Sequence, residues 1–227
     1  MKISKDDKIA LIFNASHIAA QAVLEQLLEH ESYEKILIFD EEKLEINHPK
    51  VTYFPFEVAN LESQIKGNDL YCFYDIKQAK RQTSDVKIKN LYSFQIAKIA
   101  AMNGVSQCLL LSSVSSSKTS MNFNARIRAS LEASINSLPF WAVHTFRPSA
   151  IVNTENQSRW GEQIANRLGR GLDRVTGGLV SKYRPVEANL VAKTMVDAAQ
   201  ELEEGRFLYP NTYFSDAEEQ EQSLSKQ

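Results

Sequence analysis

The sequence predicts a single α/β domain built on a doubly wound parallel sheet, and three observations support this. Six short apolar runs of strand length alternate with segments whose apolar residues recur at helical spacing. The runs are apolar throughout, which is typical of strands that helices cover on both faces. The length of 227 residues and the hydrophobic content of 43 % suit one such domain with a large core.

The first strand and helix organise the rest of the chain. Lys8–Phe13 (KIALIF) is the first strand, and a helix is predicted over Ile18–Glu29 with Ser16 as its N-cap. The remaining strands are predicted at 35–39, 51–54, 69–74, 107–111 and 141–146, with an edge strand at 207–209. Helices are predicted at 61–66, 86–103, 124–136, 160–168 and 187–202, with a glycine-rich loop at 169–178. Strands alternating with helices favour right-handed crossovers and hence a parallel sheet.

Composition argues against several classes of protein. The net charge of −2 gives no bulk attraction to nucleic acid or to an anionic membrane. No apolar run approaches the roughly 20 residues that span a bilayer. The first residues, MKISKDDK, lack the apolar segment of a signal peptide, so a cytoplasmic protein is expected. Cys72 and Cys108 lie inside apolar runs and are expected to be buried thiols, and no Cys/His spacing indicates a metal site.

A ligand site is predicted at the carboxyl ends of the strands, where ligands bind in open parallel sheets. The loops expected there are 14–20, 40–42, 74–80 and 112–118. The N-terminus of the first helix adds backbone N–H groups and a partial positive charge. The serine-rich loop Ser112–Ser117, with Lys118, Arg126 and Arg128 nearby, would suit an anion.

Five segments, in order, resemble the extended and atypical short-chain dehydrogenase/reductase superfamily. They are FNASHIAA, LLLSSVSSS, FNARIRASLE, FRPSAIV and SKYRPVEANLVAKTMVDAAQELEE. The likeness covers about residues 8–215 and is greatest to the epimerase-like branch that includes the Tat-interacting oxidoreductase proteins. It implies a Rossmann-like NAD(P)-binding domain over 1–215 with a small substrate-side lobe at about 149–215. The Glu/Gln/Ser-rich residues 216–227 are expected to be disordered.

The resemblance also implies catalytic positions, most of which are substituted here. The superfamily uses a serine after the fifth strand and a Tyr-x-x-x-Lys pair on the next helix. Ser113 matches the serine, but Asn124 stands at the tyrosine position and Arg128 at the lysine position. Asparagine cannot exchange a proton near neutral pH, and a guanidinium does not relay one. Asn124 and Arg128 are one helical turn apart and are expected to face the cleft together.

The turn after the first strand lacks the three glycines of the superfamily's GxxGxxG motif. Asn14, His17 and Ala20 stand at these positions. Ala20 is a mild change, and Asn14 is tolerable because asparagine adopts positive φ more readily than most residues. The His17 imidazole is expected to project into the volume that a pyrophosphate needs. The alternative is that His17 contacts an anion there.

The residues that would contact a dinucleotide are Asn14, Ser16, His17, Ile18 and Asp40. Asp40 ends the second strand, 20 residues after Ala20, where an acidic side chain holds the adenosine ribose. With the acidic residues at 41 and 42 it would repel a 2′-phosphate, so NAD is favoured over NADP if either binds. The alternative for Asp40 is a solvated acidic turn.

Two further residues have mainly structural interpretations. His144 lies in the middle of a strand and is expected to be a hydrogen-bonded structural histidine. Arg147, before Pro148, is expected to have a structural or cleft-edge role rather than a catalytic one.

Three functional hypotheses follow. In the first, the chain is a degenerate short-chain dehydrogenase-like protein without Tyr/Lys-dependent redox activity that binds a small or anionic ligand or a protein partner. The second is an active NAD(P)-dependent oxidoreductase or nucleotide-sugar epimerase-like enzyme with a substitute acid, such as Ser113 with His17, or Tyr74. The third is a structural protein with an empty cleft whose helices form a homodimer.

Overall fold

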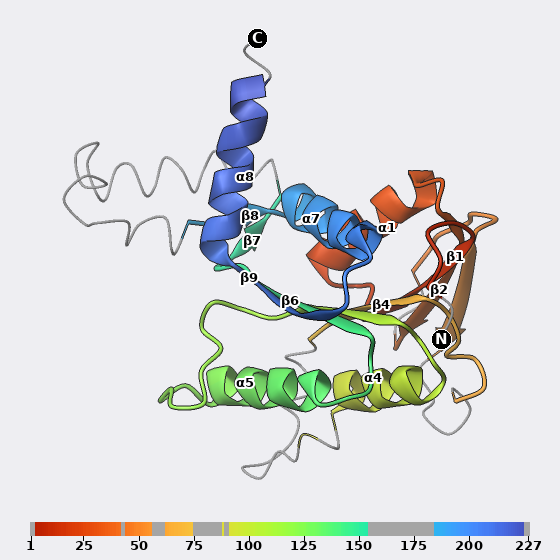
Figure 1. Cartoon of the computed structure of the whole chain (residues 1–227), viewed down its shortest axis with the longest axis horizontal. Helices are drawn as coiled ribbons and strands as arrows, with labels where there is room; N and C mark the ends of the chain where they lie inside the picture. The colour runs from red at the N-terminus through yellow and green to blue at the C-terminus, as the bar shows by residue number, and fades with distance from the viewer. Residues whose placement is uncertain are drawn as a thin grey trace.

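The computed structural model describes residues 3–41, 44–55, 62–74, 88, 91–153 and 184–224, with side chains up to Ala217. A seven-stranded parallel sheet with strand order β3-β2-β1-β4-β5-β6-β9 forms the middle layer (Figure 1). The strands are β1 Lys8–Phe13, β2 Tyr33–Asp40, β3 Val51–Pro55, β4 Asp69–Phe73, β5 Gln107–Leu111, β6 Ala142–Arg147 and β9 Gly205–Pro210. The order reverses between β1 and β4, so the predicted doubly wound Rossmann-like fold is confirmed.

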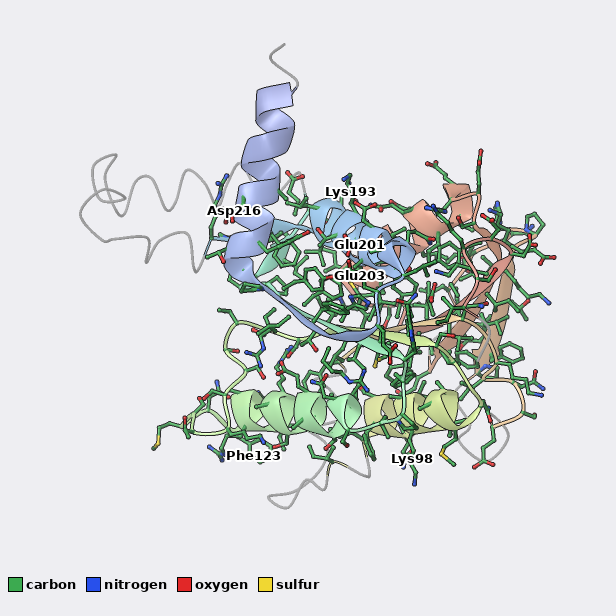
Figure 2. All side chains as sticks on the ribbon, in the orientation of Figure 1. Lys98, Phe123, Lys193, Glu201, Glu203 and Asp216 are labelled. Carbon is green, nitrogen blue, oxygen red and sulfur yellow. The ribbon has the colours of Figure 1, made fainter. Side chains whose placement is uncertain are left out.

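Helices cover both faces of the sheet. The described helices are α1 Ile18–Glu29, α4 Tyr92–Met102, α5 Phe123–Asn136, α7 Ala188–Glu201 and α8 Asn211–Leu224. Helices α1 and α7 lie on one face, and α4 and α5 lie on the other (Figure 1). The outer faces of these helices are exposed to solvent: Figure 2 shows Lys98 on α4 and Lys193 on α7 pointing away from the sheet.

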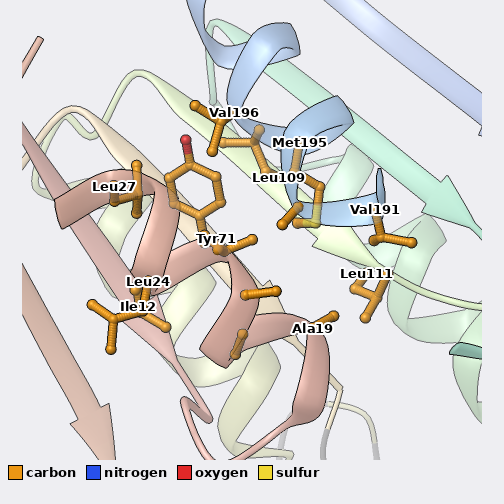
Figure 3. Packing of buried hydrophobic residues seen from close by; sticks show 14 of the residues in the cluster. Ile12, Ala19, Leu24, Leu27, Tyr71, Leu109, Leu111, Val191, Met195 and Val196 are labelled. Carbon is orange, nitrogen blue, oxygen red and sulfur yellow. The ribbon is translucent and has the colours of Figure 1, made fainter. Parts of the chain in front are cut away.

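Alternation along the strands divides the core in two. Odd and even strand positions face opposite sides, so Ile12 packs under α1 and α7 whereas Leu11 packs under α4 and α5. Figure 3 shows the first of these clusters, in which side chains of α1 and α7 meet Tyr71 and Leu109 of the sheet. Cys72 and Cys108 belong to the second cluster and are buried free thiols, as predicted. Burial raises the pKa of Cys72 to about 12, so this thiol stays protonated and unreactive.

A buried polar network joins the amino ends of four strands to α7. The Lys8 Nζ lies 2.6 Å from Asp69 Oδ2, and both side chains are almost fully buried. Asp69 also accepts hydrogen bonds from Tyr33 and Gln107. Lys8 and Gln107 both donate to the carbonyl of Ala199 near the end of α7. The network fixes β1, β2, β4, β5 and α7 relative to one another.

Three differences from the predicted elements have local causes. Residues 62–66 form a turn instead of a helix, because the chain must bring Gly67 against the β1 backbone: a Cβ there would lie 2.8 Å from the carbonyl oxygen of Ile9. The long helix predicted at 86–103 begins only at Tyr92. A short parallel ladder of β7 (Ile151–Val152) and β8 (Val186–Glu187) was not predicted, because two residues give no periodicity.

The tail also differs from the expected disorder at 216–227, since α8 continues to Leu224. Its first turn is anchored: Phe214 is fully buried, and the Asn211 side chain accepts from Ser149 N–H and donates to the carbonyl of Arg184. Glu and Gln are good helix formers, so the helix continues beyond this anchor. Farther along, α8 projects away from the sheet (Figure 1).

Some predictions fall outside the described residues. These are the helix at 160–168, the glycine-rich loop at 169–178, residue 42 of the acidic turn, and most of the loop 74–80. Among the described helices, none is both long and apolar enough to cross a membrane.

The buried Lys8–Asp69 pair generates a stability prediction. Burial raises the pKa of Asp69, and the Lys8 ammonium is the first of the groups that oppose this rise. Lys8→Met leaves the carboxylate without its counter-ion, so we expect the free energy of unfolding to fall by about 3–5 kcal/mol. Urea unfolding measures the change. Lys35→Met, at an exposed site on β2, is the control and should stay within about 0.5 kcal/mol of wild type. Equal stabilities of the two variants would contradict the prediction.

Candidate functional site

A cavity of about 200 Å³ lies at the carboxyl ends of the central strands, beside the reversal of strand order. This is the edge at which the sequence predicts a ligand site. The described residues that line the cavity come from the start of α1, the ends of β4 and β5, helix α5 and the segment after β6: His17, Ile18, Tyr74, Leu111, Ser112, Ser113, Arg128, Pro148, Ser149 and Ile151.

The turn between β1 and α1 keeps its shape without the glycines. Asn14 has φ of 62°, the left-handed conformation that glycine adopts freely and asparagine tolerates. Its N–H donates to the carbonyl of Phe39, and its side-chain oxygen accepts from the Ser16 hydroxyl. The backbone therefore has the conformation expected of the glycine-containing turn, and the difference from that motif lies in the side chains.

His17 is the N-cap of α1, so the prediction that Ser16 takes this role is wrong. The Nδ1 atom of His17 accepts a hydrogen bond from Ala19 N–H at 3.2 Å. The imidazole stacks on Phe73, with ring centroids 5.7 Å apart. Burial and, to a smaller extent, the charge of Arg128 lower the pKa of His17 to about 4. The ring is therefore neutral at pH 7, and because Nδ1 accepts, the proton is on Nε2.

The Asp40 side chain contacts the same loop between β1 and α1. Its Oδ2 accepts a hydrogen bond from Ser16 N–H at 2.9 Å, and its own carbonyl accepts from the Tyr53 hydroxyl. Asp40 is only 6 % exposed, so the alternative of a solvated acidic turn is wrong. The carboxylate occupies a backbone donor at the helix N-terminus, where the sequence suggested a contact to ribose.

The hydrogen bonds of Asp40 and His17 determine whether a pyrophosphate fits at the start of α1. Such a group binds the free N–H groups at a helix N-terminus. Here Ser16 N–H donates to a carboxylate, and Ala19 N–H donates to an imidazole. The His17 ring also lines the cavity itself. The turn in this conformation therefore does not fit the pyrophosphate of a dinucleotide.

Of the three positions implied to be catalytic, Ser113 and Arg128 line the same cavity, and Asn124, one turn before Arg128 on α5, is not among the described residues that do. That Asn124 and Arg128 face the cleft together stays a prediction. The Ser113 hydroxyl lies 3.0 Å from that of Ser115 and accepts from Ser115 N–H, so it is held within its own loop.

Arg128 is the charged group of the cavity. Its guanidinium lies over the Tyr74 ring, 4.6 Å from the ring centroid. Within the described part of the chain, no acceptor lies within hydrogen-bond or ion-pair distance of this side chain. Burial lowers the pKa of Arg128, opposed by Tyr74 and Glu132, but a guanidinium remains cationic at neutral pH. Arg128 is thus a partly buried cation without a counter-ion among the described residues.

The other nearby cations are used elsewhere. Arg147 makes two hydrogen bonds to Glu132, one of them at 3.1 Å, which confirms a structural role for this pair. Arg126 donates to the carbonyls of Ser120 and Met121 and so holds the loop before α5. Lys118 is exposed and does not line the cavity. Of the three basic residues that were predicted to suit an anion, Arg128 alone is among the described residues that line the cavity.

His144 has the structural placement expected of it. It is fully buried, its Nδ1 lies 3.1 Å from the Tyr209 hydroxyl, and its ring stacks on Phe207. Its Nε2 has no hydrogen-bond partner among the described residues. The strand register places it at the middle of β6, away from the carboxyl edge.

Sequence reasoning missed most of the apolar lining and one polar residue, Ser149, whereas Ser112 belongs to the serine-rich loop that it did predict at the site. Pro148, Ser149 and Ile151 reach the cavity because the chain after β6 returns across the start of α1, which no local pattern reveals. The Ser112 hydroxyl is buried without a hydrogen-bond partner among the described residues. The serine-rich run was the only signal for it. Among the described residues, no group of three or more His, Cys, Asp or Glu side chains is placed to hold a metal.

Comparisons with known proteins agree with this fold. No family model matches the chain. It is 23 % identical over 170 residues to Protein HTATIP2 of Rattus norvegicus, covering 71 % of this chain and 70 % of that protein. The Bordetella bronchiseptica enzyme WbmG in complex with NAD superposes with a TM-score of 0.61 at 13 % identity, covering 90 % of this chain and 73 % of that one. An oxidoreductase of the short-chain dehydrogenase/reductase family from Burkholderia thailandensis gives 0.60 at 13 % identity, covering 96 % and 98 %. The structural likenesses establish the fold.

The neutral imidazole of His17 generates a spectroscopic prediction. Nitrogen chemical shifts should report the Nε2–H form at pH 7 and protonation only near pH 4. The unfolded chain binds this proton near pH 6.5, so the free energy of unfolding should fall as the pH drops from 6.5 to 4, by up to about 1.4 kcal/mol per pH unit. His17→Asn, which keeps a capping side chain, should reduce that slope. A His17 that titrates near pH 6.5 in the folded protein would contradict the prediction.

Proposed function

We propose that this chain, a short-chain dehydrogenase/reductase-like member of the Rossmann-fold superfamily, binds a small anionic ligand at Arg128 and has no Tyr/Lys-dependent redox activity. The observation that carries the proposal is the Arg128 guanidinium, which lies in the cavity at the carboxyl edge of the sheet and has no hydrogen-bond acceptor among the described residues. The proposal has two parts, the absence of the hydride-transfer apparatus and the presence of an anion site.

The acid/base apparatus lacks its proton donor. Asn124 stands at the tyrosine position and does not line the cavity among the described residues. General acid/base catalysis contributes about 10²–10⁴-fold to a rate, and an amide cannot supply it. The turn that would bind the dinucleotide also differs from the superfamily's motif, since Asp40 and His17 accept hydrogen bonds from two of the N–H groups that would meet its phosphates.

The anion site rests on an energetic imbalance. A cation that is withdrawn from water without a partner carries a desolvation cost of several kcal/mol when fully buried, and a fraction of that when partly buried. The nearest carboxylate on the same helix, Glu132, is committed to Arg147. An anion in the cavity would offset the cost at Arg128 by charge-assisted hydrogen bonds. Residues that bind ligands commonly carry such a local penalty.

A second candidate is an active NAD-dependent oxidoreductase or epimerase-like enzyme with a substituted acid. The observation that favours it is that Tyr74 lines the same cavity as Ser113 and Arg128. A phenol beside a guanidinium could take the part of the missing tyrosine. This candidate requires the His17 ring to leave the turn, and it favours NAD over NADP because Asp40 would repel a 2′-phosphate. It predicts that NADH raises the melting temperature.

The stability of Arg128 variants tests the anion site. Because the guanidinium has no acceptor among the described residues, Arg128→Met should leave the free energy of unfolding unchanged or raise it by about 1 kcal/mol. Lys118→Met removes a charge from the exposed part of the neighbouring loop and should change it by less than about 0.5 kcal/mol. Urea unfolding in a buffer without polyvalent anions measures both. A loss of more than 2 kcal/mol in Arg128→Met would mark the arginine as a structural residue.

The part played by His17 is tested with cofactor. We expect millimolar NADH to leave the melting temperature of the wild type unchanged. His17→Asn keeps a cap for α1 but removes the ring, and His17→Gly removes both, so both variants should gain measurable NADH affinity if the ring is the obstacle. His48→Asn, on the loop before β3, is the matched control. Folded variants that bind NADH no better than wild type would show that the ring does not exclude the dinucleotide.

A further inference from the structure

The geometry points to the class of ligand: a compact monocarboxylate with an apolar body of about the size of benzoate, its carboxylate held by Arg128. This inference rests on the proposed function and deepens it. Charge, donor geometry, volume and lining each support it.

The charge of the cavity matches one negative charge. Arg128 is the only cationic side chain among the described residues of the lining, because His17 is neutral at pH 7. A phosphate group carries about −1.5 to −2 at this pH and would leave excess negative charge in a partly buried site. A carboxylate carries −1 and balances Arg128.

The donor groups suit a planar anion. The Tyr74 ring covers one face of the guanidinium, which leaves the N–H groups in its plane for hydrogen bonds. An arginine presents these as a fork that fits both oxygens of a carboxylate. His17 and Ser113 add polar side chains to the lining, and Ser112 lies beside them with its hydroxyl buried. The Ser112 hydroxyl still lacks a partner among the described residues.

The size of the cavity limits the rest of the ligand. Its volume is about 200 Å³. Pockets for drug-sized ligands span roughly 300–1,000 Å³, whereas a cavity of about 150 Å³ accommodates benzene. A volume of this size suits one ring or a short branched chain beside the carboxylate.

The lining also determines the chemistry of that body. Ile18, Leu111, Pro148 and Ile151 are apolar, and they come from α1, the end of β5 and the segment after β6. Together they supply an apolar wall that a phosphate or sulfate would leave unused. Burying a ring against such side chains contributes roughly 25 cal/mol per Å² of apolar surface, so acetate should bind more weakly than benzoate.

The test measures the binding of benzoate, acetate, benzyl alcohol, inorganic phosphate and NADH to the full chain by calorimetry and ligand-observed NMR. Benzoate should bind at least about tenfold more tightly than acetate, which lacks the ring, and than benzyl alcohol, which lacks the charge. Arg128→Met should weaken benzoate at least about tenfold, and Arg128→Lys, which keeps the charge but not the fork, should weaken it less. Lys118→Met should leave benzoate binding unchanged.

A second variant tests the apolar wall. Ile151→Ser should weaken benzoate several-fold and leave acetate unchanged. Benzoate that binds no better than benzyl alcohol, or that is indifferent to Arg128→Met, overturns the inference. Phosphate that binds through Arg128 in preference to benzoate overturns it as well, but leaves the proposed anion site intact. NADH bound by the wild type overturns the proposed function itself.

Discussion

Two hydrogen bonds close the turn between β1 and α1, and the form of the site depends on them. Asp40 accepts from Ser16 N–H, and the His17 ring accepts from Ala19 N–H. In a dinucleotide-binding turn these donors face the ligand. Here the chain supplies acceptors for both, so two of the donors that would meet a ligand are already bonded. The imidazole that makes one of these bonds also becomes a wall of the cavity and keeps it small.

The basic residues around α5 also differ in whether the described part of the chain supplies their hydrogen-bond partners. Of the basic residues around α5, Arg147 is paired with Glu132, and Arg126 holds the backbone of the preceding loop. Arg128 lies one turn before Glu132 on the same helix yet makes no bond to it. Because Glu132 can satisfy only one arginine in a bidentate manner, its commitment to Arg147 leaves Arg128 with an aromatic face and open N–H groups. That allocation, more than the loss of the tyrosine, indicates what the site can recognise.

The sequence predicted most of the fold because the information is local. Continuous apolar runs identified six of the seven strands of the sheet, and the helical spacing of Ile18–Glu29 was right at both ends. The presence of the His17 ring at the site followed from one position in the turn. Its bond to Ala19 did not, because serine is the stronger capping residue by propensity. The Asp40–Ser16 hydrogen bond could not be predicted from local patterns, since it joins residues 24 apart that meet only because β1 and β2 pair.

Among the described residues, a buried lysine and a partly buried arginine lie at opposite edges of one sheet, and their surroundings differ. At the amino edge, Lys8 meets Asp69, and the carboxylate is further satisfied by Tyr33 and Gln107. Such a closed network holds strands in place and offers nothing to a ligand. At the carboxyl edge, Arg128 has a ring beneath it and an unfilled volume beside it. An anion supplied from outside would balance this charge, and the edge on which Arg128 lies is the one where parallel sheets receive their ligands.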